Sequence, residues 1–159
     1  FRSAVKLVDS SYTYTVESIT VTGAKGGTAT YTFGGTEGKG GNWNITGSAP
    51  ASGYSYTFDN TVTAKDGIYD YTQNDNSLML YPQSLTDAKI IVKYKTEKDN
   101  ATFFNDSKEV SLTGEWTNGQ SIRYILTLPV GAEEMSVNTT YDENWDATDN
   151  EQTPKNPAS

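Results

Sequence analysis

The chain has 159 residues, a formal net charge of −8, and neither cysteine nor histidine. These two absences exclude Ser-His-Asp and Cys-His nucleophile systems, disulfide frameworks, and metal sites built on cysteine or histidine ligands. The acidic balance argues against nucleic acids and anionic membranes as partners, and no apolar run is long enough to span a bilayer.

Taken in chain order, the sequence favours β structure throughout. Alternating apolar and polar residues predict strands at 4–8, 12–21, 29–33, 43–45, 54–58, 68–71, 77–81, 88–94, 110–112, 122–128 and 135–141. Turn residues separate these runs, which indicates an all-β fold, an antiparallel β-sandwich with roughly nine to eleven short strands and no helix. The length fits one domain.

One of these runs changes phase in its middle. Tyr14 and Val16 share one parity, whereas Ile19 and Val21 have the opposite parity. Because successive side chains of a strand point to opposite faces, we expect either a bulge or a strand that switches sheets at residues 17–18.

The two ends of the chain differ from its middle. Residues 142–159 are rich in Asp, Asn, Glu and Pro, so we expect a sandwich module at 1–141 followed by a polar, partly disordered tail. The chain begins at Phe1 without a signal-peptide pattern, which suggests a processed product or an excised domain. Residues 142–149 superficially resemble a calcium loop but lack its glycine and its final glutamate. A solvated acidic tail is the preferred interpretation, an irregular calcium site is the alternative, and we expect no cofactor.

Carboxylates are the acid–base groups that remain for catalysis. A glycosidase needs two facing carboxyl groups about 5–10 Å apart. The candidates are Asp59, Asp66, Asp70, Glu115 and Asp142. Most of them lie in predicted turns, where Asp is favoured by its local backbone hydrogen bonds. We therefore predict that the chain is not an enzyme, and a carboxylate-only glycosidase is the weakest alternative.

Aromatic residues give a second functional alternative. Trp43 lies between Asn42 and Asn44 beside a glycine-rich loop, so it is the aromatic side chain most expected to be exposed. Tyr124 alternates with aliphatic residues and is predicted to be core. An exposed ring of this kind can stack against sugars, so the alternative function is a carbohydrate-binding β-sandwich module that uses Trp43.

The order of elements in the second half is more specific than any single motif. It comprises an apolar run ending in Pro82-Gln83, the extended run 88–94, a segment from Trp116 through Asn118-Gly119 into the run 122–128, and a closing run 135–141 followed by Trp145. This order resembles the fimbrillin family, the pilus subunits and surface lipoproteins of anaerobic Gram-negative bacteria. The resemblance covers about residues 3–147, and Ile122 stands where the family has the first tyrosine of its tryptophan strand.

The resemblance implies a transthyretin-like β-sandwich that is exported to the outer membrane or a fimbria as a lipoprotein. It also implies a structural or adhesive role in the fimbria. Assembly would proceed by strand exchange, in which an N-terminal strand is lost to an arginine-specific protease and replaced by a neighbour's strand. The partners implied are other fimbrial subunits or surface receptors. Stalk, accessory, anchor and tip roles all stay open.

Particular residues follow from this interpretation. Trp116 precedes a turn in which Gly119 supplies a positive φ, so we expect Trp116 to be a structural anchor at one end of the core. The working parts would be exposed sheet edges. We expect Val5 and Leu7 on the first strand, and Met135 and Val137 on the last, to lie at such edges.

Overall fold

The computed structural model describes residues 1–34, 41–62, 68–70, 78–117 and 121–142. These residues form twelve strands, one more than the upper end of the predicted range: β1 (Arg2–Leu7), β2 (Thr13–Thr22), β3 (Ala29–Thr32), β4 (Asn42–Ile45), β5 (Tyr54–Val62), β6 (Ile68–Asp70), β7 (Gln83–Ser84), β8 (Lys89–Lys98), β9 (Ala101–Ser111), β10 (Glu115–Trp116), β11 (Ser121–Leu128) and β12 (Ser136–Asp142). No helix capable of crossing a membrane occurs in the described part of the chain.

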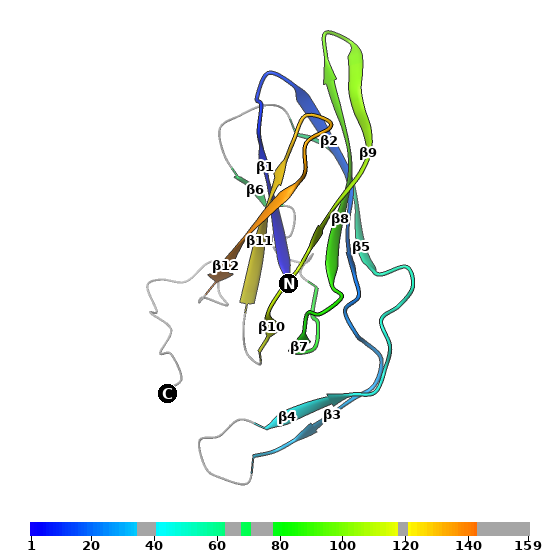
Figure 1. Cartoon of the computed structure of the whole chain (residues 1–159), viewed down its shortest axis with the longest axis vertical. Helices are drawn as coiled ribbons and strands as arrows, with labels where there is room; N and C mark the ends of the chain where they lie inside the picture. The colour runs from blue at the N-terminus through cyan, green and yellow to red at the C-terminus, as the bar shows by residue number, and fades with distance from the viewer. Residues whose placement is uncertain (35–40, 63–67, 71–77, 118–120, 143–159) are drawn as a thin grey trace.

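Two four-stranded sheets pack against each other as a sandwich (Figure 1). The first has the order β12-β11-β1-β6 and the second the order β5-β2-β8-β9. Strands β7 and β10 pair at the lower end of the sandwich, and the β3–β4 hairpin projects below them (Figure 1). The predicted all-β sandwich is thus confirmed.

One strand pair departs from the antiparallel expectation. Strand β1 runs parallel to β11, from Arg2 opposite Arg123 to Leu7 opposite Leu128. After β1 the chain crosses to the second sheet and forms β2 there, so no hairpin joins β1 to its neighbour β11. Parallel pairing requires such a crossover, whereas antiparallel pairing can be closed by a short turn.

The core lies between the two sheets and follows the alternation of their strands. In β11, every second residue is buried, from Ile122 through Leu126 to Leu128. In β8, Ile90 and Val92 are fully buried in the same way. Burying each large apolar side chain contributes about 1.5–3 kcal/mol, so this shared interior is what holds the sheets together.

Strand β2 contains the predicted bulge. Its register against both β5 and β8 shifts between Val16 and Ser18. The extra residue keeps Tyr14 and Val16 on the same buried face as Ile19 and Val21. The phase change in the sequence is therefore explained by a bulge and not by a change of sheet.

Two side chains of β8 connect the second sheet to the loop that follows β11. The Tyr94 hydroxyl donates to the carbonyl of Pro129 at 2.7 Å, and the Thr96 hydroxyl donates to the carbonyl of Val130 at 2.6 Å. Both side chains are fully buried. These bonds satisfy buried loop carbonyls and fix the turn that leads into β12.

Candidate functional site

The edges of the sheets are the first candidate surface. In the described residues, β12 and β6 are the edge strands of the first sheet, and β5 and β9 are those of the second. Strand β1 lies inside its sheet, with β11 on one side and β6 on the other. The expectation that Val5 and Leu7 mark an exposed edge is therefore wrong: Val5 is fully buried and Leu7 packs partly against the core.

Strand β12 is a long edge with no charge before its final residue, Asp142. It pairs with β11 from Ser136 to Asp142, and the backbone on its other side has no partner strand among the described residues. Val137 lies on this edge, as expected, and its side chain packs partly against the core. Met135 comes just before the strand and is 5% exposed, so it anchors the start of β12 instead of being presented.

Strand β9 is an edge of the opposite character. Asp106 and Lys108 lie opposite Tyr94 and Val92, whose side chains are buried, so both charges occupy positions on the inner face. Glu109 adds a salt bridge of 2.7 Å to Lys89. Charged residues on an edge, especially on its inner face, discourage pairing with another chain.

The remaining edges are also less suited to pairing. Strand β6 spans only three residues, and β5 follows the bulge of β2. A short or bulged strand offers an interrupted row of backbone groups. Of the four edge strands among the described residues, β12 is thus the one that is long, regular and almost uncharged.

The buried rings of Trp116 and Tyr124 form a group with the partly buried ring of Phe1, here called the core rings. The Trp116 Nε1–H donates to the Tyr124 hydroxyl at 2.8 Å. The Phe1 ring centroid lies 5.3 Å from that of Tyr124 and 6.3 Å from that of Trp116. Trp116 is 7% exposed, which fits its expected role as an anchor. Gly119 lies outside the described residues.

A depression beside the core rings is too small to hold a substrate. It is lined by Phe1, Leu80, Pro82, Trp116, Thr117 and Ile122 and has a volume of about 30 Å³. That volume corresponds to about one water molecule, whereas small-molecule sites usually enclose about 300–1,000 Å³.

A second ring group lies on the projecting hairpin and is here called the hairpin rings. It consists of Tyr31, Phe33, Trp43 and Tyr81. Tyr31 and Trp43 face each other across the β3–β4 pair, with centroids 5.1 Å apart. Phe33 lies 5.0 Å from Tyr31, and Tyr81 lies 5.5 Å from Trp43. The four rings form a continuous row in which Phe33 is 84% exposed and Trp43 is 36% exposed. The expected exposure of Trp43 is thus confirmed.

The first residue of β7 and the segment just before it fix the base of the hairpin. The Gln83 side chain accepts a hydrogen bond from the Lys25 N–H at 2.7 Å and donates one to the Lys25 carbonyl at 3.1 Å. The Tyr81 hydroxyl donates to the carbonyl of Gly27 at 3.3 Å. Two side chains distant in sequence therefore hold the non-strand segment that leads into β3.

Sequence reasoning missed Tyr81 and Gln83 as parts of this site. Their partners are more than 50 residues away along the chain, so no local pattern links them. Phe33 could have been found, because it borders the same glycine-rich loop that marked Trp43 as exposed.

The residues of the carboxylate and calcium alternatives lie mostly outside what the structure describes. Glu115 is exposed on the short strand β10. The side chains of the other candidates, Asp59, Asp66, Asp70 and Asp142, lie outside what the structure describes, as do residues 143–149. Within the described ranges, no group of three or more Asp, Glu, His or Cys residues is placed to hold a metal ion.

Comparisons of the chain with protein-family models, with curated proteins and with solved structures found no match.

Proposed function

We propose that this chain is a non-enzymatic structural or adhesive module of the fimbrillin type, which works at the bacterial cell surface and associates with other chains through a sheet edge. The observation that carries the proposal is the contrast between the uncharged edge of β12 and the charged edge of β9. The order of motifs that resembles the fimbrillin family supports a fimbria as the setting and other fimbrial subunits as the partners.

Strand addition at β12 would use the backbone for affinity. An incoming strand would pair with the free N–H and C=O groups of β12 and extend the first sheet to a fifth strand. Each backbone hydrogen bond contributes about 0.5–1.5 kcal/mol net, so a strand of this length gives a substantial total. Alternate side chains of the added strand would then reach the end of the core beside Val137.

The position of β1 favours addition at β12 over replacement of β1. Strand β1 is paired on both sides and contributes the fully buried Ala4 and Val5 to the interior. A cut after Arg2 would leave β1 in place from Ser3 onward. Processing at this arginine would therefore not vacate a groove, whereas the edge of β12 needs no strand removal.

The test introduces on β12 a charged side chain of the kind that β9 carries on its inner face. Thr139 lies on the inner face opposite Tyr124 and is exposed, so Thr139→Lys places a charge as Lys108 does on β9. Sedimentation velocity and electron microscopy of the full chain should show self-association that Thr139→Lys abolishes. Ser107→Lys, at an exposed residue on the outer face of β9, is the control for the added charge and should leave association unchanged. Equal loss in both variants, or a strictly monomeric parent chain, would contradict association through β12.

A further inference from the structure

The residues of β12 match those of a second β12 that runs in the opposite direction. The strand has 7 residues, from Ser136 to Asp142, and Thr139 is the central one. A two-fold axis through Thr139 sets two copies of β12 side by side and antiparallel, with Thr139 opposite Thr139 of the second copy and Val137 opposite its Tyr141. Every residue of the strand then has a partner. Any other centre leaves residues at the ends of the strand unpaired, so this register is the one that uses the whole edge.

This register also keeps the two faces of the sheet in order. Val137 and Thr139 lie opposite Leu126 and Tyr124, which are buried, so both occupy positions on the inner face. Directly opposite residues of antiparallel strands share a face. An axis through a residue therefore pairs inner positions with inner positions, whereas an axis between two residues would pair inner with outer positions. The first sheets of the two copies thus join into one continuous sheet with a common inner face.

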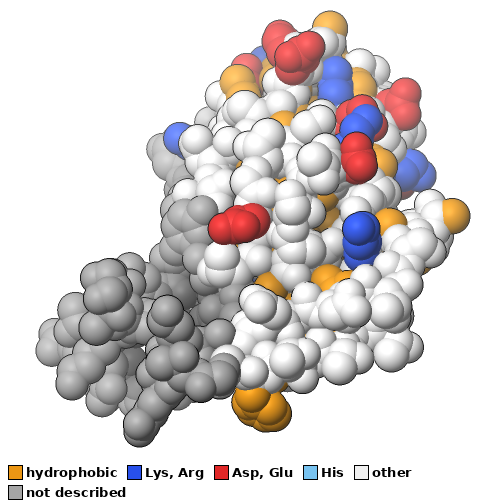
Figure 2. Space-filling view, turned by 60° about the horizontal axis from the view of Figure 1, so that its bottom comes forward, with side chains coloured by type: hydrophobic (Ala, Val, Ile, Leu, Met, Phe, Trp, Pro, Cys, Tyr) orange, Lys and Arg blue, Asp and Glu red, His pale blue; other side chains and the backbone are white. Residues whose placement is uncertain are grey.

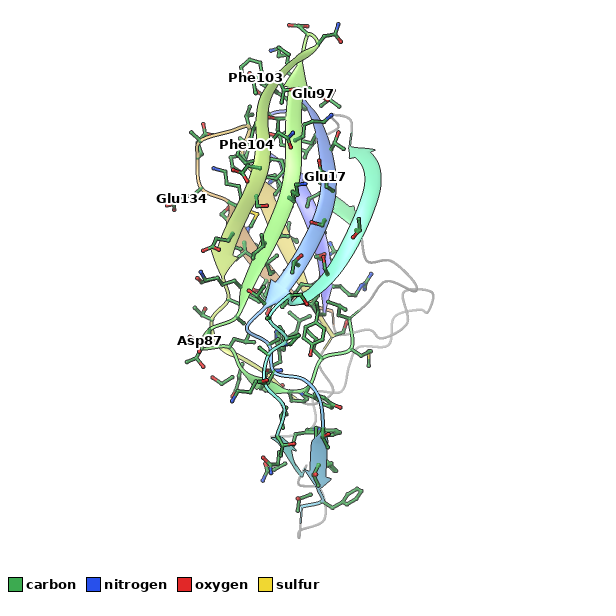
Figure 3. All side chains as sticks on the ribbon, turned by 90° about the vertical axis from the view of Figure 1, so that its right-hand side faces the viewer. Glu17, Asp87, Glu97, Phe103, Phe104 and Glu134 are labelled. Atoms are coloured by element: carbon green, nitrogen blue, oxygen red, sulfur yellow. The ribbon has the colours of Figure 1, made fainter. Side chains whose placement is uncertain are left out.

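The edge is open toward the second sheet. Thr139 is exposed although its position is on the inner face, and Val137 is only partly buried. In Figure 3, Glu134, which lies just before β12, and the edge strand β9 are both on the side of the sandwich away from β5. Because β9 carries charges on its inner face, it is unsuited to pairing with another copy of itself. Pairing between two copies is therefore confined to the first sheets.

The charge of the chain favours β12 as the place where two copies meet. Each copy has a net charge of −8, but residues 136–141 carry none, and Asp142 comes opposite Ser136 of the second copy. In Figure 2, the acidic side chains of the face in view stand among basic ones and form no continuous acidic patch. The remaining charges lie apart from the contact, where salt screens their repulsion. A basic partner, in contrast, would require carboxylates along the edge that it contacts.

The residue types that this register brings together are favourable neighbours. Thr opposite Thr, and an aromatic residue opposite a β-branched one, are stabilising cross-strand pairs. From these observations we propose that β12 pairs antiparallel with β12 of a second copy, about a two-fold axis through Thr139. The proposal rests on the association through β12 proposed above, and it names the partner. A two-fold contact occupies the same strand in both copies, so the product is a closed dimer and not a fibre.

The absence of cysteine from the chain allows a direct test with single cysteine variants. Directly opposite residues of antiparallel strands have Cα atoms about 4.5–5.5 Å apart, a separation that a disulfide can bridge. Thr139→Cys should therefore form a covalent dimer under mild oxidation. Asn138→Cys is the matched control, because Asn138 is also exposed and adjacent in sequence. Its counterpart lies two positions along the neighbouring strand, beyond the limit of about 7 Å, so we expect roughly tenfold less covalent dimer.

A mixture of two variants tests the direction and register of pairing. Val137→Cys and Tyr141→Cys should form a covalent dimer when mixed, whereas each variant alone should not. Sedimentation velocity of the parent chain and of reduced Thr139→Cys should show the same dimer, which excludes misfolding as the cause of cross-linking. The dimer fraction should rise with salt concentration, because salt screens the repulsion between two acidic copies. A dimer fraction that falls with salt would indicate contact between opposite charges and would overturn the proposal.

The cysteine variants separate this proposal from association through β12 in general. If Thr139→Lys blocks association but Thr139→Cys forms no more covalent dimer than Asn138→Cys, then β12 pairs with another segment, and the symmetric dimer is wrong. Fibres that Thr139→Lys blocks would lead to the same conclusion, because a two-fold contact cannot extend. A strictly monomeric parent chain, or association that Thr139→Lys leaves unchanged, would overturn both proposals.

Discussion

The core rings and the hairpin rings contain the same residue types at similar spacing but differ in burial. Neighbouring centroids lie 5.3–6.3 Å apart in the core rings and 5.0–5.5 Å apart in the hairpin rings. Trp116 is 7% exposed and its Nε1–H is hydrogen-bonded, whereas Trp43 is 36% exposed. Ring content alone therefore does not separate residues that hold a fold from residues available to bind. Burial and hydrogen-bond satisfaction distinguish the two kinds of residue.

Replacing each of the two tryptophans should give the largest difference in the free energy of unfolding. Trp116→Ala removes a buried ring and its hydrogen bond to the Tyr124 hydroxyl, so we expect a loss of about 3–5 kcal/mol in the free energy of unfolding. Trp43→Ala should change that free energy by only about 0.5–1 kcal/mol, because Trp43 lies outside the main core. Urea unfolding of both variants measures the difference, and equal losses would remove the distinction between the two ring groups.

Two buried tyrosines test how much a hydrogen bond of a buried hydroxyl contributes to stability. Tyr94→Phe leaves the buried carbonyl of Pro129 without its donor, so we expect a loss of about 1–3 kcal/mol. Tyr14 stacks on Tyr94 and is equally buried, but its hydroxyl makes no hydrogen bond of good geometry within the described part of the chain. Tyr14→Phe should therefore be close to neutral. Similar destabilisation of the two variants in urea would show that the loss does not come from the Tyr94–Pro129 hydrogen bond.

The same two tyrosines predict a loss of stability at alkaline pH. Burial raises the pKa of both Tyr94 and Tyr14 above the ordinary tyrosine value of 10.0. Because the unfolded state then releases its protons first, this contribution to stability is complete below about pH 10 and is lost as the pH rises beyond it. Urea midpoints measured between pH 8 and pH 11 should fall above pH 10. Tyr94→Phe should fall less steeply than the parent chain, and an identical slope would contradict the assignment.

The alternation of apolar and polar residues predicted many of the strands, because this pattern is contained within each single strand. The alternation of Ile122, Tyr124 and Leu126 indicates one buried face, and the phase change between Val16 and Ile19 locates the bulge. These features depend on neighbouring residues, whose side chains must share or oppose a face. The exposure of Trp43 was predictable for the same reason, since its polar and glycine neighbours are local.

Other features depend on partners far along the chain or on edge positions. The parallel pairing of β1 with β11 joins residues more than 100 positions apart, so Val5 could not be recognised as interior. Residues 96–105 show no alternating apolar pattern in the sequence, because β9 is an exposed edge with charged positions. In fact the chain turns only at Asp99 and Asn100, whose φ values of 51° and 61° suit a tight hairpin.

Gln83 offers the smallest and most selective change. Gln83→Ala removes the hydrogen bonds to both backbone groups of Lys25 but deletes no ring and no core side chain. We expect a loss of about 0.5–1.5 kcal/mol in the free energy of unfolding, and faster amide hydrogen exchange at Lys25 and along β3. Exchange along β8, which is paired on both sides, should be unchanged. If exchange rises equally in β3 and β8, Gln83 supports the whole sandwich, and the hairpin rings are not oriented by an independent contact.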